Sequence, residues 1–188
     1  MVEMTVNRSM ATRRHPLQAG QLDVASVSVT LADNATRVSL RAKDNAVSAL
    51  SKALGITLPM KPKTSASNGG RAALWLGPDE WLIIDDADSG VIADLAKVKV
   101  LHSAVDISHR NVGIIVAGKG AAAVVNGGCP QDLSLKAFPM GAASRTVLGK
   151  IEIVLWRTGE DAFRVECWRS FSNYAYAFLQ ESARDVAI

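Results

Sequence analysis

The chain has 188 residues, 48% of them hydrophobic and 21% charged, so it can bury one good core or two small ones. Its net charge of +3 is small, and it has neither a basic stripe nor an RNA-type aromatic motif, which argues against a nucleic-acid partner. No apolar stretch reaches the roughly 18 residues that a membrane helix needs, and the N-terminus lacks the apolar centre of a secretion signal. We therefore expect a cytoplasmic protein with no membrane partner.

The chain is predicted to begin with a flexible arm, followed by the start of an α+β lobe. Residues 1–22 are polar and aperiodic, and we expect them to order only against another surface. Residues 36–43 alternate between apolar and polar side chains, which predicts a strand. Residues 44–55 follow the helical period, with Asp44 as the expected N-cap and Gly55 as the stop.

The remaining elements of this lobe complete a familiar order. Residues 58–71 are rich in Pro, Ser, Asn and Gly and predict a loop, and residues 72–85 predict a hairpin around Gly-Pro-Asp. A short helix over 88–99 and a strand over 100–108 follow. Strand, helix, hairpin, helix and strand form a split ferredoxin-like arrangement, and we assign this first lobe to residues 23–108.

A second α+β lobe is predicted over residues 109–188, again with helices packed on an antiparallel sheet. Its expected elements are a strand over 111–118, a helix over 119–127, a loop to about 143, strands within 144–156 and 162–168, and a helix over 170–185. The last helix should be capped at Ser170 or Ser172. Its expected apolar side is Phe171, Tyr174, Ala175, Phe178 and Leu179.

The two halves contain similar hairpins, each followed by a helix. The matched positions are Leu74, Trp75, Gly77, Asp79 and Trp81 with Leu155, Trp156, Gly159, Asp161 and Phe163. Two explanations of so short a match stay open: an internal duplication of the chain, or turn residues that any two such hairpins would share.

A glycine loop in the second half has the spacing of a dinucleotide-binding fingerprint. Gly118, Gly120 and Ala123 follow an apolar run, as the fingerprint requires. However, residues 126–130 break the helix after about two turns, and the nearest acid, Asp132, comes too early to hold a ribose. We therefore favour an ordinary strand-to-helix turn.

Other candidate catalytic side chains are not supported by their neighbours. His109 follows Asp106 and Ser108, but alternation along a strand would place His109 on the opposite face, so we expect a strand-end residue. Cys129 follows the C-terminal end of a helix, where the dipole raises the pKa of a thiol. Cys129 and Cys167 are expected to be free thiols, and no histidine has a zinc-ligand spacing.

Two further sets of side chains fit either a structural or an interface role. Among Trp75, Trp81, Trp156 and Trp168, at least two should lie in the core, and the others could anchor a partner. Arg157, Arg164 and Arg169 alternate with apolar residues, which indicates a solvated sheet face or a polar contact surface. We therefore assign no catalytic, cofactor-binding or metal-ligating residue.

Several segments together resemble the gamma subunit of heterotetrameric sarcosine oxidase. They are LGPDEWLIID (76–85), residues 105–141, residues 145–171 and the last aromatic helix, with the strongest likeness in GCPQDLSLKAFPMG and LWRTG. That family is similar to a reduced form of the folate-binding aminomethyltransferase of the glycine cleavage system. The resemblance implies a two-lobed α+β fold in which Gly118 to Gly120 form a strand-to-helix turn.

The resemblance also implies an accessory function. The family's complex oxidatively demethylates sarcosine to glycine, passes the one-carbon unit to tetrahydrofolate and produces hydrogen peroxide. By this resemblance the alpha, beta and delta subunits are the partners, and FAD, FMN, NAD, tetrahydrofolate and zinc belong to them, so this chain holds no cofactor. The alternatives are a free-standing folate-binding aminomethyltransferase-like protein and a scaffold for another oxidoreductase complex.

Overall fold

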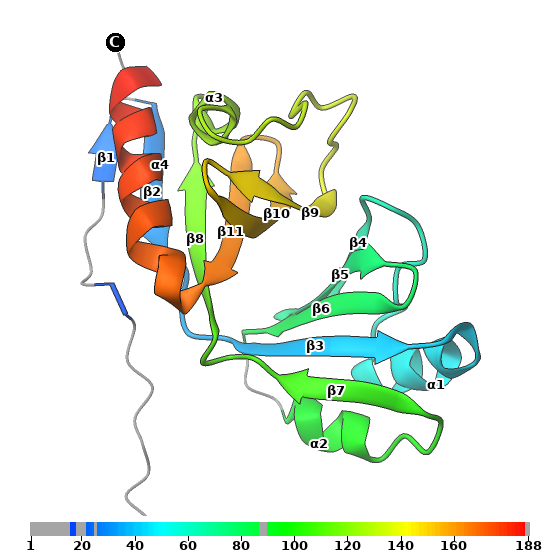
Figure 1. Ribbon diagram of the computed structural model, residues 1–188. Coiled ribbons are helices and arrows are strands. Elements are labelled where there is room, and N and C mark those ends of the chain that lie inside the picture. Colours follow the sequence, from blue (N-terminus) through cyan, green and yellow to red (C-terminus); the bar gives the residue numbers. More distant parts are fainter. Residues whose placement is uncertain (1–15, 18–21, 25, 87–89, 187–188) are drawn as a thin grey trace, which may run out of the picture.

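The computed structural model describes residues 16–17, 22–24, 26–86 and 90–186. They form two lobes, each an antiparallel sheet with helices packed on one face, as predicted (Figure 1). Most of the predicted arm over 1–22 lies outside the described residues, but Leu17 is buried in a hydrophobic cluster of the second lobe. Among the described residues, no helix is long and apolar enough to cross a membrane.

The first lobe, as we define it from the structure, is built on a five-stranded sheet of order β4-β5-β6-β3-β7. Its strands are β3 (Thr36–Ala42), β4 (Ser65–Asn68), β5 (Arg71–Gly77), β6 (Glu80–Asp85) and β7 (His102–Asp106). The helices α1 (Asp44–Leu54) and α2 (Val91–Ala96) pack on one face. Alternation in β3 places Val38 and Leu40 toward these helices, where they meet the fully buried Trp81.

Three local predictions in this lobe need correction. The N-cap of α1 is Lys43, without a side-chain cap, and Asp44 is the first helical residue, whereas Gly55 ends the helix at φ 67° as predicted. The loop expected over 58–71 contains strand β4, because its polar Ser65–Asn68 segment pairs with β5 through a tight glycine turn. Helix α2 is shorter than the predicted 88–99, and residues 87–89 lie outside the described part.

The second lobe is built on a six-stranded sheet of order β1-β2-β8-β11-β10-β9. Its strands are β1 (Leu22–Val24), β2 (Val27–Leu31), β8 (Asn111–Ala117), β9 (Ala143–Leu148), β10 (Ile151–Gly159) and β11 (Ala162–Trp168). Helices α3 (Ala121–Asn126) and α4 (Ser172–Val186) cover one face, and the 3-10 turn η1 (Arg169–Phe171) leads into α4.

The first strands of the chain lie in a different sheet from the one expected. The boundaries at 23 and 108 placed them in the first lobe, but β2 pairs with β8, with Val29 opposite Val116. The pairing buries Val27 and Val29 against the second core. Hydrophobic alternation identifies a strand but does not name its partner, so this crossover was not predictable from pattern alone.

Helix α4 buries a face rotated from the predicted one. Its buried residues are Ser172, Ala175, Tyr176, Leu179 and Ala183. Phe171 and Tyr174, expected inside, are exposed. The helical segment starts in η1, so Ser172 lies inside it and its hydroxyl donates to the carbonyl of Arg169 instead of capping the N-terminus.

The lobes are joined by a third hydrophobic cluster between the two sheets. It contains Ala35, Ala72, Leu74, Leu82, Ile84, Ile107, Ala143 and Val154. Trp156 packs against this cluster, and its Nε1 donates to Ser65 Oγ of the first lobe at 3.1 Å. Strand β5 therefore lies against β9, and the far face of the first sheet is partly covered by the second lobe.

The two similar hairpins carry the same irregularity in register. In β5 and β6 the register shifts between Trp75 and Gly77, and in β10 and β11 it shifts between Arg157 and Gly159. Trp75 therefore corresponds to Arg157 in the hairpin, and not to Trp156 as the sequence match had it. A one-residue offset moves a side chain to the other face of a sheet, so Trp75 and Trp156 have different environments.

Candidate functional site

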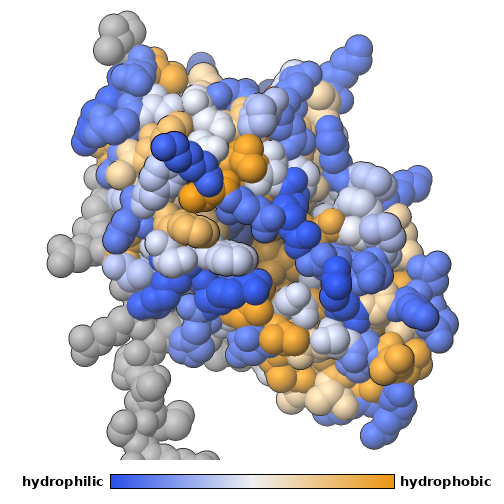
Figure 2. Space-filling model, viewed as in Figure 1, coloured by the Kyte–Doolittle hydropathy of each residue, from blue (hydrophilic) through white to orange (hydrophobic). Residues whose placement is uncertain are grey.

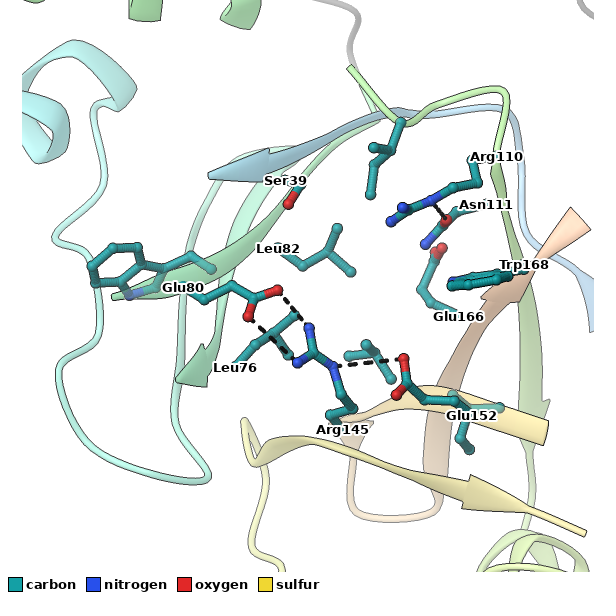
Figure 3. Close-up of a pocket in the computed structure, with 14 residues that line it drawn as sticks. Ser39, Leu76, Glu80, Leu82, Arg110, Asn111, Arg145, Glu152, Glu166 and Trp168 are labelled. Carbon is teal, nitrogen blue, oxygen red and sulfur yellow. Dashed lines mark hydrogen bonds and ion pairs between the residues drawn. The ribbon is translucent and has the colours of Figure 1, made fainter. Parts of the chain in front are cut away.

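The two lobes enclose a small cleft that brings together charged side chains from both sheets. Figure 2 shows the hollow between the lobes, and Figure 3 shows the residues that line it. Arg145 and Glu152 project from the second lobe, Ser39 and Glu80 project from the first, and Trp168 closes one end. The cleft is the best candidate site because residues distant in sequence converge in it.

The strongest polar contact between the lobes is a buried ion pair beside the cleft. Arg37 of β3 donates from Nε to Glu166 Oε2 at 2.6 Å and from Nη2 to Oε1 at 3.0 Å, across the two sheets. The side chains are 4% and 0% exposed. A bidentate, desolvated pair fixes both distance and orientation, so it sets how the sheets meet.

Glu166 also holds a second arginine from its own strand. Arg164 Nε donates to Glu166 Oε1 at 2.8 Å, and its Nη1 reaches Asp86 at 3.3 Å. Burial opposes the charge of Arg164, but Glu166 and Asp86 outweigh it and raise the pKa of this guanidinium. One carboxylate is thus shared by two arginines, which compensates part of its desolvation.

A glycine makes room for this ion pair. A Cβ atom at Gly113 of β8 would lie 2.8 Å from Glu166 Oε1, 2.9 Å from Ala32 Cβ and 3.1 Å from Arg37 Nη2. Glycine is therefore required here by close approach. Together with the RVE sequence of β11, which puts Arg164 and Glu166 on one face, it is the signal that could have indicated the network.

A second group of charges lies at the mouth of the cleft. Arg145 of β9 donates from Nη2 to Glu80 Oε1 at 2.5 Å and approaches Glu152 at 3.7 Å, while Arg41 pairs with the other oxygen of Glu80. Burial by itself raises the pKa of Glu80, but the hydrogen bonds and charges of Arg145 and Arg41 lower it overall. Of these pairs, Arg145–Glu80 bridges the two lobes, at modest gain in stability.

The dimensions of the cleft decide what it can hold. Its volume is about 40 Å³, enough for a few water molecules, whereas ligand pockets usually measure several hundred Å³. Its buried carboxylate is occupied by two arginines. The arrangement is suited to joining the lobes.

The glycine loop is a tight packing turn. A Cβ at Gly118, whose φ is 118°, would lie 2.0 Å from the carbonyl oxygen of Ser26, and a Cβ at Gly120 would lie 2.6 Å from Val27 Cγ2. Strand β8 pairs antiparallel with both β2 and β11, so the parallel β-α-β unit that a dinucleotide needs is not formed around it. The expected strand-to-helix turn is confirmed.

His109 lies in a turn and not at a strand end, because β7 already stops at Asp106. Its ring is exposed. Ser108 is instead the ordered residue of this turn: its hydroxyl contacts Asp106 Oδ1 at 2.5 Å and accepts from the backbone N–H of Arg37 at 2.8 Å. Asp106 and Ser108 therefore position the strand that carries Arg37.

Both cysteines are free, as predicted, and both are buried. Cys129 follows α3 and its Sγ lies 3.8 Å from Thr146 Oγ1. Burial, reinforced by the neighbouring Glu166, raises the pKa of the Cys167 thiol to about 12. Neither environment resembles that of a reactive thiolate, which needs exposure and positive charge.

The raised pKa of Cys167 predicts a loss of stability in alkali. The folded thiol keeps its proton to about pH 12, whereas an unfolded thiol loses it near its ordinary value of 9.0, so the unfolded state binds fewer protons between these values. The unfolding free energy should fall there by up to about 1.4 kcal/mol per pH unit from this group. In urea titrations between pH 8 and 10.5, Cys167→Ala should show a shallower decline than the parent chain; equal slopes would contradict this origin.

The tryptophans divide between core and surface. Trp81 is fully buried and its Nε1 donates to the carbonyl of Pro59 at 2.7 Å. Trp75 and Trp156 pack at the edges of two hydrophobic clusters. Trp168 is 44% exposed. Of the at least two tryptophans expected in the core, Trp81 is fully buried and Trp75 and Trp156 are only partly buried, whereas Trp168 faces solvent.

The arginine prediction is wrong for two residues of three. Arg157 and Arg164 are buried, and only Arg169 is exposed. Arg157 lies over the ring of Phe163 at 4.4 Å and donates to the carbonyls of Glu160 and Leu133. It thereby fastens the loop after α3 to the hairpin, and burial lowers the pKa of its guanidinium. Arg157 lies opposite Phe163 on the helix-covered face and Arg164 lies opposite Trp156 on the other face, and both faces are covered by other parts of the chain.

Within the described residues, no group of three histidine, cysteine or acidic side chains is arranged to hold a metal ion. Asp132, discounted as a ribose ligand, accepts the backbone N–H of Ser134 at 2.8 Å in an exposed turn. The fingerprint residues, His109 and Cys129 are thus not brought together in one place, whereas Arg37, Arg164 and Glu166, which sequence reasoning did not combine, are.

Sequence comparisons relate the chain to one family. The model of the sarcosine oxidase gamma subunit family matches residues 40–185. A sarcosine oxidase gamma subunit of an Arthrobacter species is 36% identical over 160 residues, covering 81% of this chain and 78% of the relative. That of Corynebacterium sp. strain U-96 is 32% identical over 200 residues, covering 100% and 98%.

Structural comparisons agree. A chain of the heterotetrameric sarcosine oxidase from Corynebacterium sp. U-96, in complex with pyrrole 2-carboxylate, is similar with a TM-score of 0.83 and 28% identity, covering 89% of this chain and 88% of that chain. The glycine cleavage system aminomethyltransferase T from Bartonella henselae has a TM-score of 0.62 at 14% identity, covering 86% and 50%. The second likeness shows the fold alone.

Proposed function

The chain belongs to the sarcosine oxidase gamma subunit family, and we propose that it is the accessory gamma subunit of a heterotetrameric sarcosine oxidase. The observation that carries the proposal is the similarity, over 89% of the chain, to a component of such a complex. The cleft is consistent with this role, because its charged residues are engaged in joining the lobes.

In this proposal the catalysis belongs to the assembly. The complex would oxidatively demethylate sarcosine to glycine, transfer the one-carbon unit to tetrahydrofolate and produce hydrogen peroxide. We propose that the partners are the alpha, beta and delta subunits and that they hold FAD, FMN, NAD, tetrahydrofolate and zinc. The two buried free thiols suit a reducing compartment, which supports a cytoplasmic location.

The division of the chain in this role follows its sheets. We propose that the chain divides near residue 108, as predicted, except that β1 and β2, which the predicted bounds of 23–108 gave to the first lobe, belong with 109–188 in the second lobe. The arm over 1–22 is proposed to order against a partner surface. The buried ion pairs of Arg37, Arg164 and Glu166, which we call the joining network, then lie between the two lobes of the subunit.

A pull-down tests the proposal directly. The chain, tagged at its C-terminus in its native cells grown on sarcosine, should come out with three further chains as a yellow complex, identified by mass spectrometry and an absorbance scan. Isolation of the chain alone and colourless would contradict it. Purification of a complete and active flavin complex from cells lacking this chain would also count against a stabilising role.

A further inference from the structure

Three side chains form a continuous exposed stack on the second lobe, which we call the aromatic stack: Arg110, Trp168 and Phe171. The guanidinium carbon of Arg110 lies 5.5 Å from the ring centroid of Trp168. The rings of Trp168 and Phe171 are stacked with centroids 5.9 Å apart and planes 14° apart. Trp168 is 44% exposed and Phe171 38%. Burying such large apolar rings is favourable, so an exposed stack of them is typical of a surface that binds another protein.

The backbone holds the stack in place. Trp168 is the last residue of β11 and pairs with Asn111 of β8. The N–H of Arg169 donates to the carbonyl of Arg110 at 2.6 Å, and Phe171 ends the 3-10 turn before α4. Because the stack is built on paired strands and a helix start, it would lose little conformational entropy on binding.

The stack separates two depressions of the surface. Arg110 and Trp168 line the end of the cleft between the lobes, where Figure 3 shows them beside Asn111. They also line an open groove of about 540 Å³ on the other side. The residues of this groove are Pro16, Arg110, Trp168, Arg169, Ser170, Ser172 and Asn173.

The chemistry of the groove selects its partner. Among the residues that the structure describes, its lining contains two arginines and no carboxylate. Arg110 donates from Nε to Asn111 Oδ1 at 3.2 Å, and in the described part of the chain it forms no ion pair, unlike Arg37, Arg145 and Arg164. A planar guanidinium above a tryptophan is suited to a carboxylate approaching beside an apolar group.

Resting on the proposed gamma-subunit role, we propose that the aromatic stack and its groove are the docking site for an acidic segment with an apolar anchor on another subunit of the complex. Tryptophan and arginine are enriched among the residues that dominate the binding energy of protein interfaces, and this pair lines both the cleft and the groove. A second copy is disfavoured, because a two-fold contact centred on the stack would face Arg110 and Arg169 with the same residues.

The test is assembly of the complex with variants of the stack. Tagged wild type, Trp168→Ala and Arg110→Glu are each co-expressed with the partner subunits, and the affinity of the purified chain for the remaining complex is measured by titration. We expect Trp168→Ala to weaken binding by about 30-fold or more and Arg110→Glu by about 10-fold or more. Arg110→Glu should also reduce the salt dependence of binding.

Matched variants on the other lobe serve as controls. Leu101→Ala removes an exposed apolar side chain before β7, and Lys99→Glu reverses an exposed charge. Both should bind like wild type. Unchanged circular dichroism and melting temperature of the stack variants would confirm that they fold.

The outcomes separate the two proposals. If the wild-type chain does not join the complex, the gamma-subunit proposal fails and the docking site fails with it. If the wild type joins but the stack variants bind equally tightly, or the controls weaken binding as much, only the docking site is overturned. Self-association of the isolated chain in sedimentation experiments, abolished by Trp168→Ala, would instead assign the stack to a second copy and overturn it too.

Discussion

Replacing Glu166 by alanine should lower the free energy of unfolding by about 3–5 kcal/mol. The substitution removes the carboxylate shared by Arg37 and Arg164 and leaves two guanidinium groups buried near each other, with side chains 4% and 7% exposed. Arg164 would keep only Asp86, at 3.3 Å, and the charge of Arg37 would lose the carboxylate that compensates its lost hydration. Urea unfolding of the isolated chain, followed by circular dichroism, measures the loss.

Glu152→Ala is the matched control for this experiment. Glu152 also contacts an arginine between the strands of the second lobe, but at 3.7 Å and with 58% of its side chain exposed. Its removal should cost less than about 1 kcal/mol. Equal losses for the two variants would mean that the buried network is not what joins the lobes. Glu166→Gln keeps the shape and should lie between them.

Gly118→Ala should destabilise the chain by about 3 kcal/mol, through two separate causes. The φ of 118° is unfavourable for any residue with a Cβ, and the added methyl would lie 2.0 Å from the backbone oxygen of Ser26. Because that neighbour is backbone, relief requires β2 to move away from β8. Thermal and urea unfolding measure the effect.

Gly55→Ala separates the two causes. Gly55 also has a positive φ, of 67°, but a Cβ there would meet nothing within 4 Å. Gly55→Ala should therefore lower the free energy of unfolding only through the unfavourable backbone conformation, by about 1 kcal/mol. If Gly118→Ala cost no more than Gly55→Ala, the close contact with Ser26 would not limit this turn.

Local patterns predicted most of the elements. Alternation over 36–43 gave β3, the glycine stop at Gly55 fixed the end of α1, and the Gly-Pro-Asp turn gave the hairpin of β5 and β6. These features depend on neighbours in sequence. The polar strand β4 was missed for the same reason, since its stability comes from pairing with β5 and not from its own composition.

The joining network was not predictable because it depends on which faces are covered. Arg37 and Glu166 are 129 residues apart, and nothing in either strand indicates that the two will meet. Alternation does not place Arg157 and Arg164 together: Arg157 of β10 lies opposite Phe163, on the face covered by the helices, and Arg164 of β11 lies opposite Trp156, on the other face of the sheet. Both faces are covered by other parts of the chain, and a pattern in one strand does not report what packs against it.

The aromatic stack was partly predictable from the sequence. Trp168 was identified as one of four tryptophans able to anchor a partner, and the structure leaves it 44% exposed. Its association with Arg110 and Phe171 follows from the register of β8 and β11 and from the 3-10 turn after β11. These depend on tertiary pairing, so the sequence suggested the anchor but not its neighbours.

The pairing of β2 with β8 has a consequence for folding during synthesis. When Val29 leaves the ribosome, its partner Val116 has not been made, and the whole first lobe lies between them in sequence. The continuous segment from β3 to β7 can therefore collapse early. The edge of β2 that pairs with β8 stays unpaired until β8 has been synthesised. Closing so long a loop raises the contact order and slows folding. Completion of the second sheet should be the late step, and the waiting strands are then the segment most exposed to aggregation.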